Sequence, residues 1–364
     1  MKNSVLICYL LISTSFIHPP VEIAVITTTA SASGNLFIII TDGFRWQEVF
    51  NGADSLLINN ETFTADTATL KSLFWAGTKE ERRKRLMPFF WNVIANRGQL
   101  IGNRDLNNKM NVANMYSVSY PGYNEIFTGT TDLGISGNGK KKNPNINVLE
   151  YLECKEEFKG KVAVFSSWDV FPYILNRERN NMMMNSGYEQ LKVQNDETEM
   201  INAVQEKAII SKTAARYDML TYTTAKEYIK TSHPRIVVIG FGETDDFAHQ
   251  KKYDLYLQQA NQVDRMIGEL WHMVQTTPGY KNNTSFLITT DHGRGNSTKH
   301  WSGHGFFIDG SSQTWLALMG PNIEALGERT EKQKLYNKQI AETIANLVGE
   351  DFSQGEALIS LSKK

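Results

Sequence analysis

The sequence predicts an α/β protein whose mainly parallel central sheet carries helices on both faces. Three short apolar runs of the β type occur at 36–40, 236–241 and 285–288. Runs without polar alternation are typical of strands that are buried on both faces, as in parallel sheets. Between these runs lie segments with helical spacing of apolar residues, of which the clearest contains Leu255, Ala260, Val263, Ile267, Leu270 and Val274. Strands that alternate with helices in this way favour a layered α/β domain.

The composition is that of an ordinary globular protein. The chain has 364 residues, 41% of them hydrophobic, and a formal net charge of −1, which provides enough apolar material for a large core. The basic residues at 82–85 follow two acids and fit a solvated helix face, so we expect no nucleic-acid-binding surface. We expect one domain over 33–364, with insertions near 52–79 and 173–196, where no periodicity is evident.

The N-terminal segment 1–32 has the features of a secretory signal peptide. Lys2 precedes an apolar stretch at 5–17, and Ala30-Ser31-Ala32 forms a small-residue cleavage motif, although its distance from the apolar stretch leaves the cleavage position open. The apolar stretch is shorter than the roughly 20 residues of a membrane span. We therefore expect an exported, periplasmic or secreted protein without a stable membrane span. Cys154 would be the only cysteine of the mature chain, which excludes an internal disulfide.

The remaining elements follow from the spacing of apolar residues and from turn signals. In the first half we predict a strand at 35–41, a short helix towards Phe50, a helix at 80–85 that leads into an amphipathic stretch at 86–94, a strand at 99–101, a helix from Pro121, a helix at 148–158 and a strand at 161–166. In the second half we predict a loop or cap over 173–196, a long helix over 197–231, the two apolar strands and their helix, a strand at 314–319 and a last helix over 331–347.

The ends of the apolar runs carry residues that bind metals. Open α/β sheets bind ligands at the carboxyl ends of their strands. Asp245 and His249 lie four residues apart after the second run, so they point the same way on a helical turn. With His304 they form a two-histidine, one-carboxylate set that suits zinc. A second set comprises Asp42, Asp291 and His292. Two neighbouring cations suit a displacement reaction at phosphorus.

Each of these motifs also has a simpler interpretation. An aspartate at a strand end can cap a helix or begin a turn, and a histidine can satisfy a backbone carbonyl. Asp246, three residues before His249, can equally replace Asp245 as a ligand. The share of histidine favours two zinc ions, with manganese or another divalent cation as the alternative. The joint pattern of both sets is what favours a metal centre.

Ser119 is the predicted nucleophile. It precedes Pro121, and a proline suits the first turn of a helix, whose free N–H groups form an anion site. Direct coordination to a cation would deprotonate the hydroxyl. Arg45 or Asn124 would hold the oxygen atoms of the transferred group, and His300 would line the substrate pocket. Taken alone, a serine at this place is more often a helix cap.

Together these residues resemble the alkaline phosphatase superfamily, in particular its branch of type I phosphodiesterases and nucleotide pyrophosphatases. Asp42-Gly43-Phe44-Arg45 is similar to the first metal motif of that branch, and Ser119-Tyr120-Pro121 to its nucleophile motif. The resemblance spans 35 to about 321. It implies the three-layer sandwich of alkaline phosphatases and a phosphoseryl intermediate. It also implies one zinc bound by Asp42, Asp291, His292 and Ser119, and another bound by Asp245, His249 and His304.

Two positions depart from the motifs of related branches. Gly122 stands where the diesterases usually carry an asparagine after the proline, which leaves monoesters and diesters open. Tyr123 stands where the sulfatase motif C/S-x-P-x-R has its arginine, which disfavours a typical sulfatase. We therefore expect a metal-dependent hydrolase of small-molecule phosphate esters. The alternatives are a relative that transfers sulfate, phosphonate or phosphoethanolamine groups, and a non-catalytic metal-containing binding protein. The oligomeric state is not predicted.

Overall fold

A computed structural model describes residues 34–193, 195–207, 209, 211–212, 215–353, 355 and 357–358. It also describes the backbone of two short strands that pair in parallel, β1 (Thr28–Thr29) and β13 (Leu361–Ser362). Apart from β1, the predicted signal segment 1–32 lies outside the described residues. Within the described part of the chain, none of the helices is both long and apolar enough to span a membrane.

The described molecule is built around an eight-stranded sheet in the order β11-β3-β10-β8-β2-β7-β5-β6. In this sheet only β10 runs against the other described strands, because it pairs antiparallel with β3 and β8 while every other neighbouring pair is parallel. The predicted mainly parallel sheet is confirmed, with β2 inside it. The strands are β2 (Asn35–Thr41), β3 (Gly98–Ile101), β5 (Val162–Ser166), β6 (Met183–Ser186), β7 (Ile236–Phe241), β8 (Thr284–Thr289), β10 (Leu316–Met319) and β11 (Gly327–Glu328).

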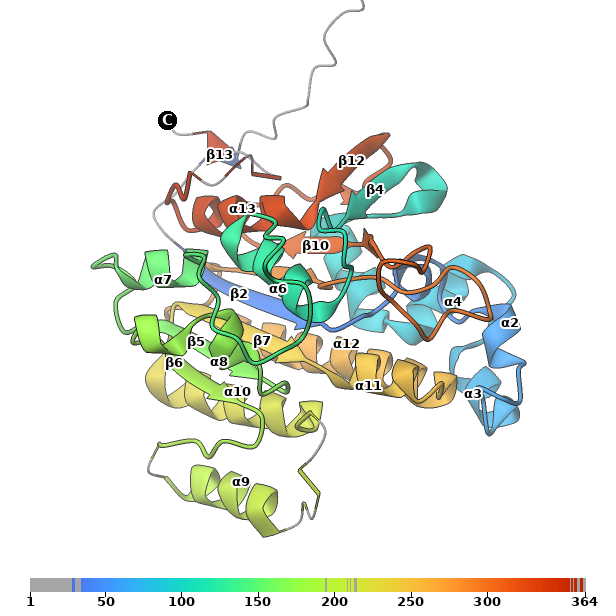
Figure 1. Cartoon of the computed structure of the whole chain (residues 1–364), viewed down its shortest axis with the longest axis horizontal. Coiled ribbons are helices and arrows are strands. Elements are labelled where there is room, and N and C mark those ends of the chain that lie inside the picture. The colour runs from blue at the N-terminus through green and yellow to red at the C-terminus, as the bar shows by residue number, and fades with distance from the viewer. Residues whose placement is uncertain are drawn as a thin grey trace, which may run out of the picture.

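Strand β2 separates two hydrophobic cores. Phe37 and Ile39 belong to one core, whereas Leu36, Ile38 and Ile40 belong to the other. All five are fully buried, and each buried apolar side chain of this size contributes about 1.5–3 kcal/mol to folding. This arrangement explains why the run has no polar alternation. It also makes the molecule a three-layer sandwich, with α10 and α12 on one face of the sheet and α6, α7 and α13 on the other (Figure 1).

The helices connect these strands and cover both faces. They are α1 (Trp46–Asn51), α2 (Ser55–Ile58), α3 (Thr67–Phe74), α4 (Lys79–Leu86), α5 (Ala95–Arg97), α6 (Ser119–Thr128), α7 (Val148–Glu153), α8 (Phe171–Ile174), α9 (Asp196–Lys207), α10 (Asp218–Ser232), α11 (Glu243–His249), α12 (Tyr253–Thr276) and α13 (Ile340–Leu347). A π-helical turn, Phe90–Ile94, precedes α5. A small second sheet joins β12 (Gln333–Tyr336), β4 (Asn108–Asn111) and β9 (Gln313–Thr314).

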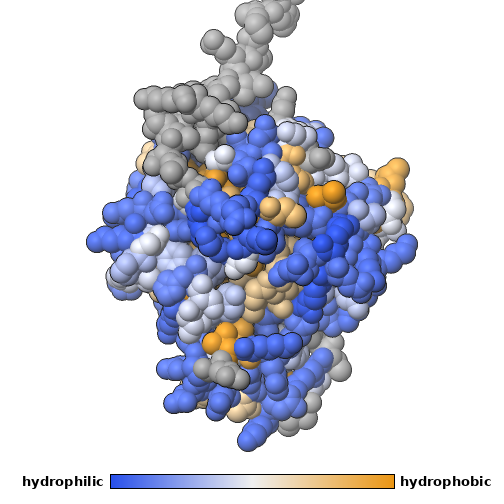
Figure 2. Space-filling view, turned by 90° about the vertical axis from the view of Figure 1, so that its left-hand side faces the viewer, coloured by the Kyte–Doolittle hydropathy of each residue, from blue (hydrophilic) through white to orange (hydrophobic). Residues whose placement is uncertain are grey.

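Three predicted segments differ from the structure, and a fourth, which showed no periodicity, contains two short helices. The supposed loop 173–196 contains the edge strand β6, which pairs with β5, and the supposed long helix 197–231 is two helices, α9 and α10. The supposed last helix 331–347 begins with β12 and is helical as α13 only from residue 340. The insertion 52–79 contains α2 and α3, each capped by an aspartate side chain. The side of the molecule on the left of Figure 1, where β6 ends the sheet, is mostly hydrophilic (Figure 2).

Candidate metal centre

Three neighbouring parallel strands deliver the predicted ligands to one edge of the sheet. β8, β2 and β7 lie side by side. Asp42 directly follows β2, and Asp291 and His292 follow β8 after one intervening residue. β7 leads into α11, which carries Asp245 and His249. Because parallel strands end at the same edge, side chains that are far apart in sequence meet there.

The first ligand set is buried and compact. The Nε2 atom of His292 lies 3.4 Å from Oδ1 of Asp42 and 3.6 Å from Oδ2 of Asp291. The Oγ atom of Ser119 lies 3.4 Å from the same Asp42 oxygen and 3.3 Å from His292 Nε2. Ligands held tetrahedrally at zinc bond lengths lie roughly 3.3 Å from one another. These four distances match the spacing of ligands around one ion.

Asp291 provides an independent test of whether a cation fits here. Its Oδ1 atom accepts a hydrogen bond from the Gly43 amide at 3.0 Å. Its Oδ2 atom is buried and has no hydrogen-bond partner among the described residues. A buried carboxylate oxygen without a donor is costly, and a bound cation would remove that cost. The residues present therefore fit a divalent cation.

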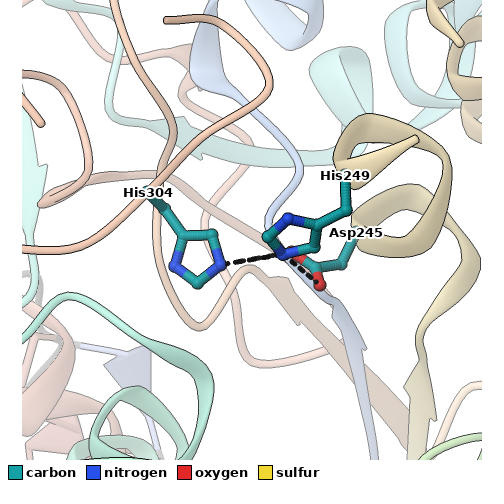
Figure 3. Close-up of side chains that lie close together, drawn as sticks. All are labelled: Asp245, His249 and His304. Carbon is teal, nitrogen blue, oxygen red and sulfur yellow. Dashed lines mark hydrogen bonds and ion pairs between the residues drawn. The ribbon is translucent and has the colours of Figure 1, made fainter. Parts of the chain in front are cut away.

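The side chains of the second ligand set point toward one another (Figure 3), and this set is more open than the first. It lies beside the first set, since Asp245 Oδ1 is 4.0 Å from His292 Nε2. His249 Nε2 is 3.2 Å from Asp245 Oδ2 and 3.1 Å from His304 Nε2. Asp245, and not Asp246, is the carboxylate of this set. The Nδ1 atom of His304 lies 3.1 Å from the carbonyl oxygen of Ser117, which fixes the ring and leaves Nε2 free to bind a metal.

Electrostatics distinguish the two sets. Burial lowers the pKa of His304, as does the neighbouring His292, and burial also lowers the pKa of His249. Both of these imidazoles are therefore neutral, as metal ligands must be. Burial alone would lower the pKa of His292, but the carboxylates of Asp291 and Asp42 raise it to about 9. The first set thus holds a proton at neutral pH when no cation is bound.

Arg294, which the sequence analysis missed, joins the ligand-bearing segments. Its buried guanidinium forms an ion pair with Asp245 and donates to the carbonyl oxygens of Gly43 and Ser302. Gly43 has a φ of 57°, and a Cβ there would lie 2.8 Å from Asp245 Oδ1. A glycine is therefore required where the first metal motif passes Arg294 and Asp245. The only available signal for Arg294 was its position two residues after His292.

Helix α6 places Ser119 and packs closely on the first ligand set. The helix predicted from Pro121 begins two residues earlier, with Ser119 as its first residue. The Tyr123 hydroxyl donates to Asp42 Oδ2 at 3.2 Å, so the residue at the sulfatase-arginine position orients a metal ligand instead. Gly122 faces the backbone of Asp291, where a Cβ would lie 2.9 Å from the carbonyl carbon and closer still to the oxygen. This contact explains why the position carries no asparagine.

The substrate-binding role predicted for Arg45 does not fit its surroundings. Its guanidinium is buried and forms a two-pronged ion pair with Glu48, with Nε 2.9 Å from Oε2. It also donates to the carbonyl oxygen of Gly295 and lies over the ring of Trp301. Because its donors are used in the core, Arg45 supports the ligand-bearing loops and does not face the site. Trp301 packs in the same core.

Asn124 and His300 were also placed at the substrate by prediction. The side chain of Asn124 is buried, donates to the Thr130 carbonyl at 2.8 Å and accepts from Asn143 and Asn145. It anchors the loop after α6 and does not line the cavity at Ser119. His300 is exposed, with Ser297 Oγ 3.4 Å from its Nδ1, and it does not line the cavity at the serine.

A cavity of about 290 Å³ opens beside the first set. Its walls include residues that the sequence analysis did not single out: Asn138, Trp168 and Lys212 join Asp42 and Ser119 there. Oδ1 of Asn138 accepts from the Tyr120 amide at 3.0 Å, which places Asn138 at the start of α6. These residues sit on loops whose folding only the tertiary structure reveals.

Comparison with known proteins supports the metal centre. The family model described as the Metalloenzyme superfamily matches residues 181–314. This span contains both strands β7 and β8 and five of the six proposed histidine and aspartate ligands, all except Asp42. No curated protein matches the sequence.

Solved structures share the fold at low sequence identity. The wild-type alkaline phosphatase PafA is 12% identical, with a TM-score of 0.59 over 91% of this chain and 99% of its own. A putative sulfatase from Bacteroides thetaiotaomicron and the lipoteichoic acid synthase LtaP from Listeria monocytogenes are each 12% identical. Their TM-scores are 0.58 and 0.57, each over 90% of this chain and 74% of their own. The chain therefore has the fold of the alkaline phosphatase superfamily and matches the metalloenzyme superfamily in sequence over 181–314, as its motifs indicate.

Proposed function

We propose that this protein is an exported hydrolase of phosphate esters that uses Ser119 as its nucleophile and two divalent cations. The observation that carries the proposal is the position of the Ser119 hydroxyl, which completes the first ligand set at 3.3–3.4 Å from His292 and Asp42. The metalloenzyme match and the two three-residue ligand sets support the same reading. Zinc is the favoured cation because three of the six ligands are histidines.

The proposed reaction has two displacements at phosphorus. Bound cations would supply positive charge that neutralises the phosphoryl oxygens and lowers the pKa of the serine hydroxyl. Ser119 Oγ forms a bond to phosphorus while the bond to the ester oxygen breaks, and the alcohol leaves with a proton. Water then attacks the phosphoseryl group, which releases the phosphate and restores the hydroxyl. Tyr123 and Arg294 contribute by keeping Asp42 and Asp245 in place.

The chain itself supplies the surroundings of the transferred group. The start of α6 presents backbone N–H groups, which favour an anion. The cavity at Ser119 is of small-molecule size, and Asn138 and Lys212 are among its lining residues. We propose that Asn138 holds a phosphoryl oxygen in place of Arg45 and Asn124, whose donors are used elsewhere. The Lys212 ammonium already forms an ion pair with Glu206 at 2.8 Å. Trp168 forms an aromatic wall for the leaving group.

The position of Tyr123 favours phosphate esters over sulfate esters as substrates. Tyr123 occupies the position of the sulfatase arginine, and its hydroxyl is bound to Asp42. It therefore orients a carboxylate of the first ligand set, and this position offers no cationic side chain to a sulfate group. Monoesters and diesters are both compatible with the cavity.

A substrate panel on protein of known metal content tests the proposal. We expect turnover of p-nitrophenyl phosphate or bis-p-nitrophenyl phosphate with zinc or manganese, and little turnover of p-nitrophenyl sulfate. Ser119→Ala should lower kcat by at least about 10³-fold with metal content close to wild type. Ser186→Ala is the matched control, since Ser186 is equally buried and its hydroxyl has no hydrogen-bond partner among the described residues. Failure of every phosphate ester with either metal, or full activity of Ser119→Ala, would refute the proposal.

A further inference from the structure

Four exposed apolar side chains lie on loops that also carry residues of the candidate site. Met115 is 50% exposed, Leu133 74%, Phe306 56% and Phe307 94%. The rings of the two phenylalanines touch edge to face, with centroids 4.8 Å apart. We call these four residues the apolar rim. Keeping such large side chains in water has no benefit for folding, so a cluster of them indicates a surface that binds something.

The loops that carry the rim also carry the site. Phe306 follows His304 by two residues, Met115 lies four residues before Ser119, and Leu133 lies in the loop that continues to Asn138. Contacts hold the three loops together: His304 Nδ1 is 3.1 Å from the Ser117 carbonyl, and the Tyr116 hydroxyl donates to the Leu133 carbonyl at 2.9 Å. The loops that carry the rim are therefore linked to one another and to the metal centre.

The strong exposure of the rim favours insertion into a lipid layer over binding to a protein partner. Phe307 projects almost entirely into solvent, whereas a protein partner usually needs side chains that fill a pocket on a well-packed patch. Aromatic side chains at loop tips suit the boundary between lipid headgroups and acyl chains. Lys299 and Asp309 are both exposed in the same loop, so its two exposed charged side chains are of opposite sign.

We propose that the apolar rim inserts into the surface of a phospholipid bilayer and holds the site over phosphate esters of lipids. The lipid-ester part of this proposal rests on the proposed function, whereas bilayer binding does not require any turnover. The predicted consequence is a protein that cleaves the same type of bond faster in a lipid surface than in free solution.

Flotation with vesicles tests the binding directly. Protein as recovered from the expressing cell, with its N-terminus read by mass spectrometry, is mixed with vesicles of phosphatidylcholine and phosphatidylglycerol in equal parts. We expect the wild type to float with the vesicles and the double variant Phe306→Ser, Phe307→Ser to partition at least roughly tenfold more weakly. Met200→Ser is the matched control, because Met200 is 63% exposed on α9, away from the rim. Phe307→Ser alone, at the most exposed position, is the fallback if the double variant misfolds.

Activity distinguishes failure of this proposal from failure of the proposed function. The double variant should keep wild-type kcat/KM on a soluble phosphate ester and lose activity on phospholipid in vesicles in proportion to its lost binding. Flotation of wild type and double variant to the same extent, or of neither, would overturn the proposal. A wild-type dimer in sedimentation that dissociates in the double variant would assign the rim to a second copy of the chain and also overturn it. If no ester is hydrolysed at all, the proposed function fails while flotation still decides about the rim.

Discussion

Replacing Gly122 by alanine tests whether α6 must pack directly on the metal-binding loop. A Cβ there would lie 2.9 Å from the carbonyl carbon of Asp291, whereas ordinary contacts begin at 3.4 Å. The obstructing atoms belong to the backbone of a buried residue, so they cannot rotate away. Since protein interiors have little free space, α6 or the loop must move by at least the difference, about 0.5 Å.

This shift acts on both components of the proposed reaction, because α6 begins with Ser119 and Asp291 is a ligand of the first set. A misplacement of about 1 Å can cost on the order of 100-fold in rate, so half of that predicts roughly a tenfold loss of kcat. Overpacking should also lower the free energy of unfolding by about 1–3 kcal/mol. In an unobstructed helix the same change would instead stabilise by about 0.5–1 kcal/mol. The sign of the stability change therefore tests the argument.

The assay is kcat on the ester that the wild type cleaves, together with thermal unfolding in the presence of excess metal. Gly137→Ala is the control, because a Cβ at Gly137 meets nothing within 4 Å. Gly122→Asn, which restores the residue usual in the diesterases, should be more damaging than alanine and should not raise diesterase activity. A Gly122→Ala protein with wild-type kcat and a raised Tm would show that α6 can accommodate a Cβ against Asp291, and it would refute the reasoning.

Three further predictions concern the ligands. Tyr123→Phe removes the hydroxyl that donates to Asp42. The loss of about 1 kcal/mol of hydrogen bonding predicts up to roughly tenfold weaker cation binding at the first set. Competition with a metal-chelating dye measures this affinity, and an unchanged value would speak against an orienting role. Arg294→Lys keeps the charge but not the guanidinium fork that joins Asp245 to two loops. Cobalt spectra should therefore show that the second ligand set loses its cation first. Equal loss from both sets would contradict this. Cation binding at the first set should strengthen as pH rises towards about 9. The carboxylate neighbours of His292 raise its pKa to about 9, and its proton must leave before a cation can bind. Calorimetry that finds the same affinity at neutral and alkaline pH would exclude this competition.

The central strands and their ligands were predictable because one physical cause produces both signals. A strand buried on two faces has a continuous apolar run, and the polar residue that ends it stands at the sheet edge. β2, β7 and β8 all follow this rule. Edge elements lack such a signal. β6 is a short Met-Asn-Ser strand at the end of the sheet, and its sequence resembles a loop.

Substrate contacts were harder to predict than ligands because they depend on which polar groups already have partners. Arg45 was expected at the substrate, although Glu48 lies three residues on, in the first turn of α1, and forms an ion pair with its guanidinium. That i, i+3 spacing was a usable signal for an ion pair. Asn124 offers no comparable clue, since its partners Thr130, Asn143 and Asn145 come from a loop whose path is set by tertiary packing.

The contact between His304 and Ser117 links the proposed nucleophile to the second ligand set. Ser117 has a φ of 49°, an uncommon conformation for a residue other than glycine, and its carbonyl oxygen lies at His304 Nδ1. Two residues later the same turn begins α6 with Ser119. Any movement of this turn therefore shifts a ligand of one set and the hydroxyl of the other together. The geometry of the two proposed cation sites is consequently fixed as a unit, and a variant that displaces the turn should impair both.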